Sequence, residues 1–134
     1  MTPDLKNVLV FISLLATGVL LEDVLVKFYI LLTNKSLRNV HFSLGRYAFL
    51  MLTPMLTIIL FSIKQNINLT TIFISFSLAG TALEWLVGYS YHQIVGQRLW
   101  TYHRYSLKGY TSLLSIPLWG LGGVLFWLMA KAFV

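Results

Sequence analysis

Glu22 and Glu84 are the side chains in this sequence whose types and positions could do chemistry, because each lies inside a long apolar run. Each is about 15 residues into its run, or about 22 Å along a helix, at or just past mid-membrane. A carboxyl group there costs roughly 2.5–3.5 kcal/mol to insert and should face protein or a water-filled cavity. Because burial disfavours the charged form, we expect each to hold its proton at neutral pH, or the two to share one. They are a candidate proton or cation site; the alternative is a neutral hydrogen-bonding contact between helices.

Small and polar residues recur every four positions around the second of these acids: Gly80, Glu84, Gly88, His92 and Gly96. This spacing places them along one ridge of a helix, and the glycines would let a neighbouring backbone approach closely. Glu84 and His92 are then expected in a seam between helices. His92 could relay protons at physiological pH or could be a hydrogen-bonded histidine near the membrane surface.

Other residues in the apolar runs favour structural roles. Asp23 and Lys27 have the spacing of an ion pair within one helix, which would let the first run insert. Pro54 and Pro117 each remove a helical hydrogen bond and are expected to kink their helices.

Composition identifies the class of protein that must hold these residues. The chain has 134 residues, of which 57% are hydrophobic and 10% charged, with no cysteine. A soluble domain carries about 25% charged residues, so this chain is expected to be a polytopic membrane protein. The net charge of +6 lies mostly in short loops between apolar runs, where it indicates membrane orientation rather than nucleic-acid binding.

Signatures of cofactor chemistry are missing from the sequence. The three histidines, His41, His92 and His103, lack the spacing of a helical metal-binding pair, so no metal site and no cofactor are predicted. Without a phosphate-binding loop, ATP hydrolysis would require a separate ATPase chain.

Four apolar segments are long enough to cross a bilayer. They run from about residue 7 to 32, 44 to 63, 69 to 95 and 110 to 133. The predicted fold is all-α, a single transmembrane domain over residues 1–134.

Loop charges predict the orientation of this domain. Six basic residues lie in or beside the two longer loops and three lie on the other side; the six are Lys35, Arg38, Arg46, Arg98, Arg104 and Lys108. The 1–2 and 3–4 loops are therefore expected in the cytoplasm, with both termini outside. Trp100, Tyr102, Tyr105 and Tyr110 fit an aromatic belt at the cytoplasmic surface.

The two halves of the chain resemble each other at an offset of 62 residues. Uncommon residue types recur in pairs: Gly18 with Gly80, Glu22 with Glu84, Tyr29 with Tyr91, Tyr47 with Tyr110 and Pro54 with Pro117, the last two pairs after a one-residue insertion. We predict two parallel two-helix repeats, residues 1–66 and 67–134, related by an axis along the membrane normal.

Several segments of the second half resemble a known family. They are Glu84-Trp85-Leu86-Val87-Gly88, Gly96-Gln97-Arg98-Leu99-Trp100-Thr101-Tyr102, Gly109-Tyr110-Thr111-Ser112-Leu113 and Trp119-Gly120. Together they resemble the ABC-transporter type IV (CmpB-like) integral membrane proteins. The chain is a divergent member by this pattern, since Thr101 replaces an aspartate of the family. The resemblance implies a permease-like protein of the bacterial inner membrane.

Three functions are compatible with these features. The first is a small transport protein or permease-like subunit, acting as a homodimer or in a larger complex. Its site residues would be Glu22, Glu84, Tyr89, His92, Arg46, Arg98, Trp100 and Tyr102. The second is a membrane enzyme that uses Glu22 or Glu84 as a general acid on a lipid or isoprenoid. The third is a non-catalytic subunit of a larger membrane complex.

Overall fold

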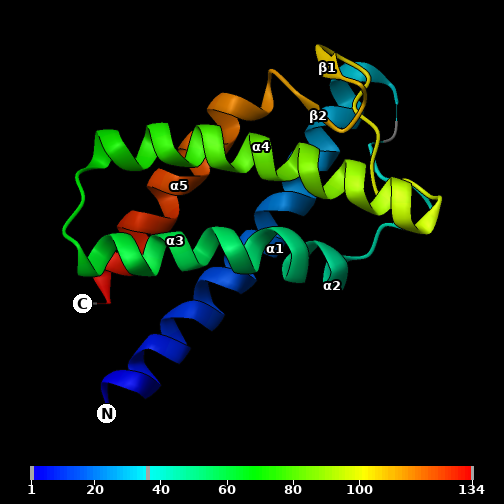
Figure 1. The fold of residues 1–134 in the computed structure, drawn as a ribbon. Helices are drawn as coiled ribbons and strands as arrows, with labels where there is room; N and C mark the ends of the chain where they lie inside the picture. The colour runs from blue at the N-terminus through cyan, green and yellow to red at the C-terminus, as the bar shows by residue number, and fades with distance from the viewer. Residues whose placement is uncertain (1, 36, 134) are drawn as a thin grey trace.

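The computed structural model describes residues 2–35 and 37–133 and contains four helices long and apolar enough to cross a membrane (Figure 1). The first is α1 (Pro3–Thr33) and the third is α4 (Leu69–Val95). The second is built from α2 (Leu44–Tyr47), the π-helical turn η1 (Ala48–Leu52) and α3 (Thr53–Lys64). The fourth is α5 (Ser115–Ala132). The predicted polytopic, four-helix membrane fold is confirmed.

Local signals at both ends explain why the bounds of α4 match the predicted span. Asn68 caps the helix, and its side-chain oxygen accepts a hydrogen bond from the backbone N–H of Thr71 at 2.8 Å. Gly96 ends it in the left-handed conformation with φ +83°, which a glycine adopts without strain.

The second membrane helix changes its hydrogen-bond pattern just before Pro54. In η1 the backbone N–H of Thr53 donates to the carbonyl of Ala48, and the Thr53 hydroxyl donates to the same oxygen at 3.0 Å. Pro54 has no N–H to donate, and this wider turn accommodates the loss. The irregularity predicted at Pro54 in the second span is therefore a π-turn.

The fourth helix begins later than predicted. Residues 110–112 belong instead to a hairpin in which β1 (Ser106–Leu107) pairs antiparallel with β2 (Thr111–Ser112), and residues 113–114 form a turn before α5. The hydroxyls of Thr111 and Ser112 bind tertiary partners, which a continuous apolar helix facing lipid could not provide. Because α5 starts at Ser115, Pro117 falls in the first turn, where its missing N–H costs no hydrogen bond. The predicted kink at Pro117 was therefore wrong.

The two long connections meet at one end of the bundle. Arg38, between α1 and α2, forms a β-bridge with Trp100, between α4 and β1. The backbone N–H of Asn39 donates to the carbonyl of Leu99 at 3.1 Å. Helices α1 and α4 thus finish at the same end, whereas the sequence repeat itself stays a prediction.

Helices α4 and α5 have the most extensive contact of any two elements. A Cβ on Gly80 of α4 would collide with Trp119 of α5, so this glycine lets the two helices approach closely. Phe76 is fully buried in the same interface. Gly80, Glu84 and Gly88 of the predicted ridge on α4 are thus buried against protein, whereas Gly96 at its end is exposed.

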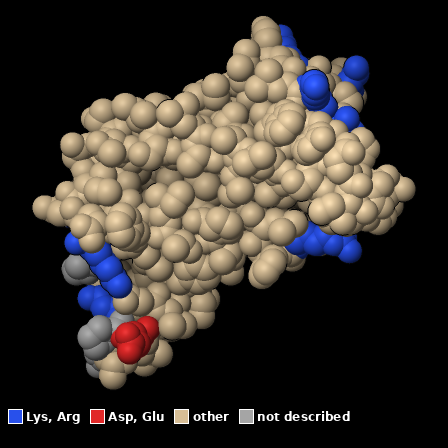
Figure 2. Space-filling model, viewed as in Figure 1, with Lys and Arg blue, Asp and Glu red and all other residues tan. Residues whose placement is uncertain are grey.

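The surface between the two ends of the bundle is apolar. In Figure 2, Lys and Arg gather at the two ends of the visible face, and the band between them carries no charged side chain. Large apolar side chains are exposed on the helices, including Leu31, Phe49 and Ile94 at 75%, 74% and 83%. An exposed apolar band of this kind is suited to contact with lipid tails.

Candidate functional site

Glu22 of α1 and Glu84 of α4 line one cavity of about 290 Å³. Glu84 is 5% exposed, and the side chain of Glu22 is 14% exposed. Residues of α1, η1, α5 and the connection after α4 complete the wall. The two acids are thus shielded from bulk solvent and share a single internal space.

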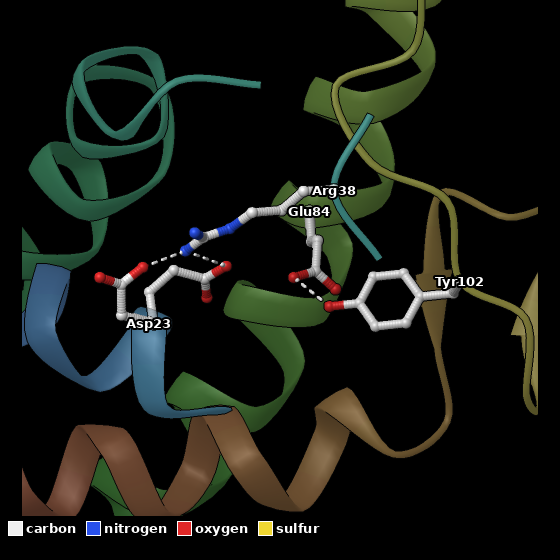
Figure 3. Close-up of polar contacts among 5 residues, drawn as sticks. Asp23, Arg38, Glu84 and Tyr102 are labelled. Atoms are coloured by element: carbon white, nitrogen blue, oxygen red, sulfur yellow. Dashed lines mark hydrogen bonds and ion pairs between the residues drawn. The ribbon is translucent and has the colours of Figure 1, made fainter. Parts of the chain in front are cut away.

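Three hydroxyl groups hold the carboxylate of Glu84 in place. Tyr102 donates to Oε2 at 2.9 Å (Figure 3). Thr111 and Ser115 donate to Oε1 at 2.6 and 2.9 Å. Tyr102 and Thr111 belong to the connection between α4 and α5, and Ser115 begins α5. This connection folds back into the bundle because its hydroxyls satisfy a buried carboxylate.

Glu22 lies beside a basic residue of the other connection. Arg38 Nη2 is 2.7 Å from Asp23 Oδ1 and 3.9 Å from Glu22 Oε1 (Figure 3). Tyr47, next to η1, is a hydrogen-bonding neighbour of Glu22. The Glu22 carboxylate is therefore held more loosely than that of Glu84, since its ion-pair distance is at the limit of direct contact.

The ion pair expected within α1 is not present among the described residues, because Asp23 pairs with Arg38 rather than with Lys27. Arg38 reaches α1 because its segment is joined to the 96–114 connection by backbone hydrogen bonds. A contact between segments distant in sequence has replaced the local one.

Aromatic side chains line the cavity next to the two acids: Tyr29, Tyr47, Tyr102 and Trp119. The rings of Tyr29 and Tyr102 meet edge to face with their centroids 5.8 Å apart. Burial of its phenol group, and then the nearby Glu84, raise the pKa of Tyr102 well above its usual value. Tyr102 therefore stays a hydrogen-bond donor across the physiological pH range.

Sequence reasoning left four polar residues of this site out of the candidate set: Tyr29, Tyr47, Thr111 and Ser115. Tyr29 and Tyr47 did carry a signal, because each recurs in the second half at the repeat offset. The hydroxyls of Thr111 and Ser115 carried none, since serine and threonine in an apolar run usually bond to their own helix.

Five other candidate residues do not line the cavity: Arg46, Tyr89, His92, Arg98 and Trp100. Most of them surround Tyr110. His92 Nδ1 is 2.8 Å from the Tyr110 hydroxyl, Trp100 donates to the Tyr110 carbonyl at 2.7 Å, and the Arg98 guanidinium lies 4.5 Å above its ring. The exposed Tyr89 packs edge to face on the same ring.

Arg46 has a different position from that group. Its guanidinium donates to the carbonyl of His41 at 2.6 Å, within the connection before α2. These contacts describe how the connections are fastened to the helices, and the roles predicted for the five residues in substrate binding stay predictions.

The predicted aromatic belt is also corrected in part. Trp100 and Tyr110 are 4% and 5% exposed and are packed inside the end of the bundle where the two long connections meet, whereas Tyr105 is 60% exposed. Trp100 Nε1 and the Tyr110 hydroxyl find partners there, so neither ring needs the membrane surface to satisfy its polar atom.

Glutamate, histidine and aspartate side chains do not gather elsewhere in a way that suggests metal binding. In residues 2–35 and 37–133 no group of three or more such side chains is placed to hold a metal ion. The chemistry that the site can perform with its own residues is hydrogen bonding, charge pairing and proton exchange at carboxyl groups.

The motif residues of the second half have clear structural positions. Gly88 of α4 packs against Trp100 and Tyr110. Gly109, with φ +81°, allows the turn of the hairpin and lies against Arg98. The same residues that carry the sequence pattern therefore fasten the 96–114 connection over Glu84.

Comparison with known proteins agrees with this pattern. No curated protein and no solved structure matches the chain. A family model described as "Putative ABC-transporter type IV" matches residues 9–134, which is nearly the whole chain. The chain therefore belongs to that family of membrane proteins.

Proposed function

We propose that this protein is a small permease-like transport subunit of a bacterial inner membrane, and that its substrate binds in the cavity at Glu22 and Glu84. The single observation that supports this most is the shared cavity, because two carboxyl groups from different spanning helices line it. Ionisable groups inside membrane domains most often mark substrate or proton pathways. Membership of an ABC-transporter family supports the same reading.

The two acids have different tasks in this proposal. Glu84 is fixed by Tyr102, Thr111 and Ser115, so it supplies a constant acceptor at the inner end of the cavity. Glu22 is the more loosely held of the two and exchanges its proton or its Arg38 contact for the substrate. Substrate binding and proton movement are then coupled at one carboxyl group.

The orientation and assembly follow from the loop charges and from the size of the chain. The connections that carry Arg38 and Arg98 face the cytoplasm in this proposal, with both termini outside. Four helices are few for a complete pathway, so the subunit works as a homodimer or with other membrane chains. A separate ATPase chain is a partner of the kind that the family name implies.

Proton flux in membrane vesicles tests the proposal. Vesicles that contain the protein are acidified, and compounds of several chemical classes are added while a fluorescent dye reports the internal pH. We expect at least one class to release protons with the wild type, Glu22→Asp to retain part of this flux and Glu22→Gln to abolish it. Asp4→Asn, at an acid outside the cavity, is the matched control. Wild-type flux in Glu22→Gln would contradict the proposal.

A membrane enzyme that acts on a lipid or isoprenoid is the second candidate. The observation in its favour is the set of apolar and aromatic side chains that surround the acids, including Leu25, Leu118 and Trp119. A carboxylic acid could protonate an alkene there, and the rings could stabilise the resulting cation. Deuterium incorporation from D₂O into an added isoprenoid, lost in Glu22→Gln and Glu84→Gln, would favour this candidate over transport.

A further inference from the structure

One side of the cavity is formed by the lipid-facing edges of α1 and α5. Leu25 of α1 and Leu118, Leu121 and Leu125 of α5 line the cavity, and they are 37%, 44%, 60% and 39% exposed. The cavity is partly open to the surface, and these side chains, which both line it and are exposed, mark its rim. Because these positions lie in membrane-spanning segments, the opening faces the interior of the bilayer.

Gly122 keeps this opening clear. It lines the cavity on α5, and a Cβ placed on it would meet no atom within 4 Å. Gly80 is the contrasting case, since a Cβ there would collide with Trp119. A glycine that is not needed for close helix packing leaves a gap in an otherwise leucine-rich wall.

The inner end of the cavity is acidic, in contrast to its apolar opening. Glu22 and Glu84 supply two carboxyl groups to it, and no lysine, arginine or histidine of the described residues lines the cavity. Glu84 already accepts three hydrogen bonds, which leaves Glu22 as the carboxylate with capacity for a ligand. Rings of Tyr29 and Trp119 stand beside the acids and can face a cation.

Resting on the proposed function, we infer that the substrate is a lipophilic cation that enters sideways from the bilayer between α1 and α5. Its cationic head occupies the inner end beside Glu22, and its apolar body lies along Leu118, Leu121 and Leu125. Charge complementarity selects the head, and the apolar opening selects a molecule already dissolved in the membrane. The cavity of about 290 Å³ has room for one small head group, with the rest of the molecule in the opening.

Binding of radiolabelled decyltrimethylammonium tests this inference. The full chain is reconstituted in nanodiscs of zwitterionic lipid, and partition into empty nanodiscs is subtracted. We expect saturable binding with which decyl sulfate does not compete. Tetramethylammonium, which has the same head but no chain, is expected to compete at least about tenfold more weakly.

Two substitutions separate the opening from the head site. Gly122→Phe fills the opening and is expected to weaken binding at least about tenfold. Leu128→Phe, at a 51% exposed position of α5 outside the cavity, is the matched control and should bind like the wild type. Glu22→Gln should abolish binding and Glu22→Asp should retain it. Circular dichroism and gel filtration confirm that each variant is folded.

The outcomes distinguish this inference from the proposed function. Equal affinities for tetramethylammonium and decyltrimethylammonium, with wild-type binding in Gly122→Phe, would overturn entry from the bilayer and leave the Glu22 site intact. Binding that is indifferent to Glu22→Gln would overturn the head site. Absence of saturable binding would overturn the cationic substrate class, whereas the proton-flux assay with its wider set of compounds would still decide the proposed function.

Discussion

Tyr102, in the connection between α4 and α5, donates a hydrogen bond of 2.9 Å to Glu84, in the middle of a spanning helix. The contact joins a loop that sequence places at the membrane surface to an acid that sequence places at mid-membrane. It is possible because the connection folds into the end of the bundle and does not stay outside it. The site is therefore closed at this end by the protein's own hydroxyls.

Loss of the Tyr102 hydroxyl should destabilise the fold. Tyr102→Phe leaves a buried carboxylate with one donor fewer, which costs about 1–3 kcal/mol. Chemical unfolding in detergent measures the difference in free energy. Tyr105→Phe is the control, because Tyr105 is 60% exposed and its hydroxyl has no comparable role. Equal losses in the two variants would contradict the assignment.

Alkaline pH should weaken the fold through the same residue. The pKa of Tyr102 is raised in the folded state, so above pH of about 10 the unfolded chain loses this proton before the folded chain does. The stability that this group contributes is complete below that pH and is lost as the pH rises further. Between neutral and strongly alkaline pH, the thermal unfolding temperature should fall less steeply in Tyr102→Phe than in the wild type. Parallel curves would show that Tyr102 is not the buried phenol described.

A double-mutant cycle tests the contact between Thr111 and Glu84. Thr111 is 1% exposed and its hydroxyl lies 2.6 Å from Glu84 Oε1. Thr111→Val alone should destabilise by about 1–3 kcal/mol, since it leaves the carboxylate with less compensation. In a Glu84→Leu background the same change should cost much less, because no carboxylate remains. Additive losses would indicate that the two side chains are not coupled.

Two glycines in membrane helices should respond in opposite ways to the same substitution. Gly80→Ala places a methyl group against Trp119 and should cost about 1–3 kcal/mol through forced repacking of α4 on α5. Gly122→Ala meets open space and should stabilise the fold by up to about 1 kcal/mol, because alanine is favoured over glycine inside a helix. Unfolding of both variants in the same detergent gives the comparison. A larger loss at Gly122 than at Gly80 would contradict the packing described.

The elements that sequence predicted correctly are those with local signals. Helix α4 was predicted from about residue 69 to 95 as an apolar run, and its bounds agree because the cap residues Asn68 and Gly96 act within one turn. The start of α5 was missed because residues 110–114 read as apolar, whereas the buried hydroxyls of Thr111 and Ser112 find partners only in the tertiary structure. Hydropathy is a local average and does not register such partners.

In the candidate site, too, the sequence identified the features with local signals and missed those that depend on tertiary contacts. Glu22 and Glu84 stood out because a carboxyl group is costly in an apolar run, whatever its neighbours are. That Arg38, rather than Lys27, pairs with Asp23 depends on how two connections are joined by backbone hydrogen bonds. Spacing within one helix carries no information about that pairing.

Carbodiimide labelling tests most directly the central claim that Glu22 and Glu84 share one internal cavity reached from the membrane. Membranes that contain the wild-type protein are treated with dicyclohexylcarbodiimide, an apolar reagent for carboxyl groups, and the modified residue is located by mass spectrometry. We predict that the label falls on Glu22, that its rate changes in Glu84→Gln and that it is slowed in Gly122→Phe but not in Leu128→Phe. A label at Glu22 whose rate is the same in all of these variants, or no label at Glu22, would contradict the shared cavity.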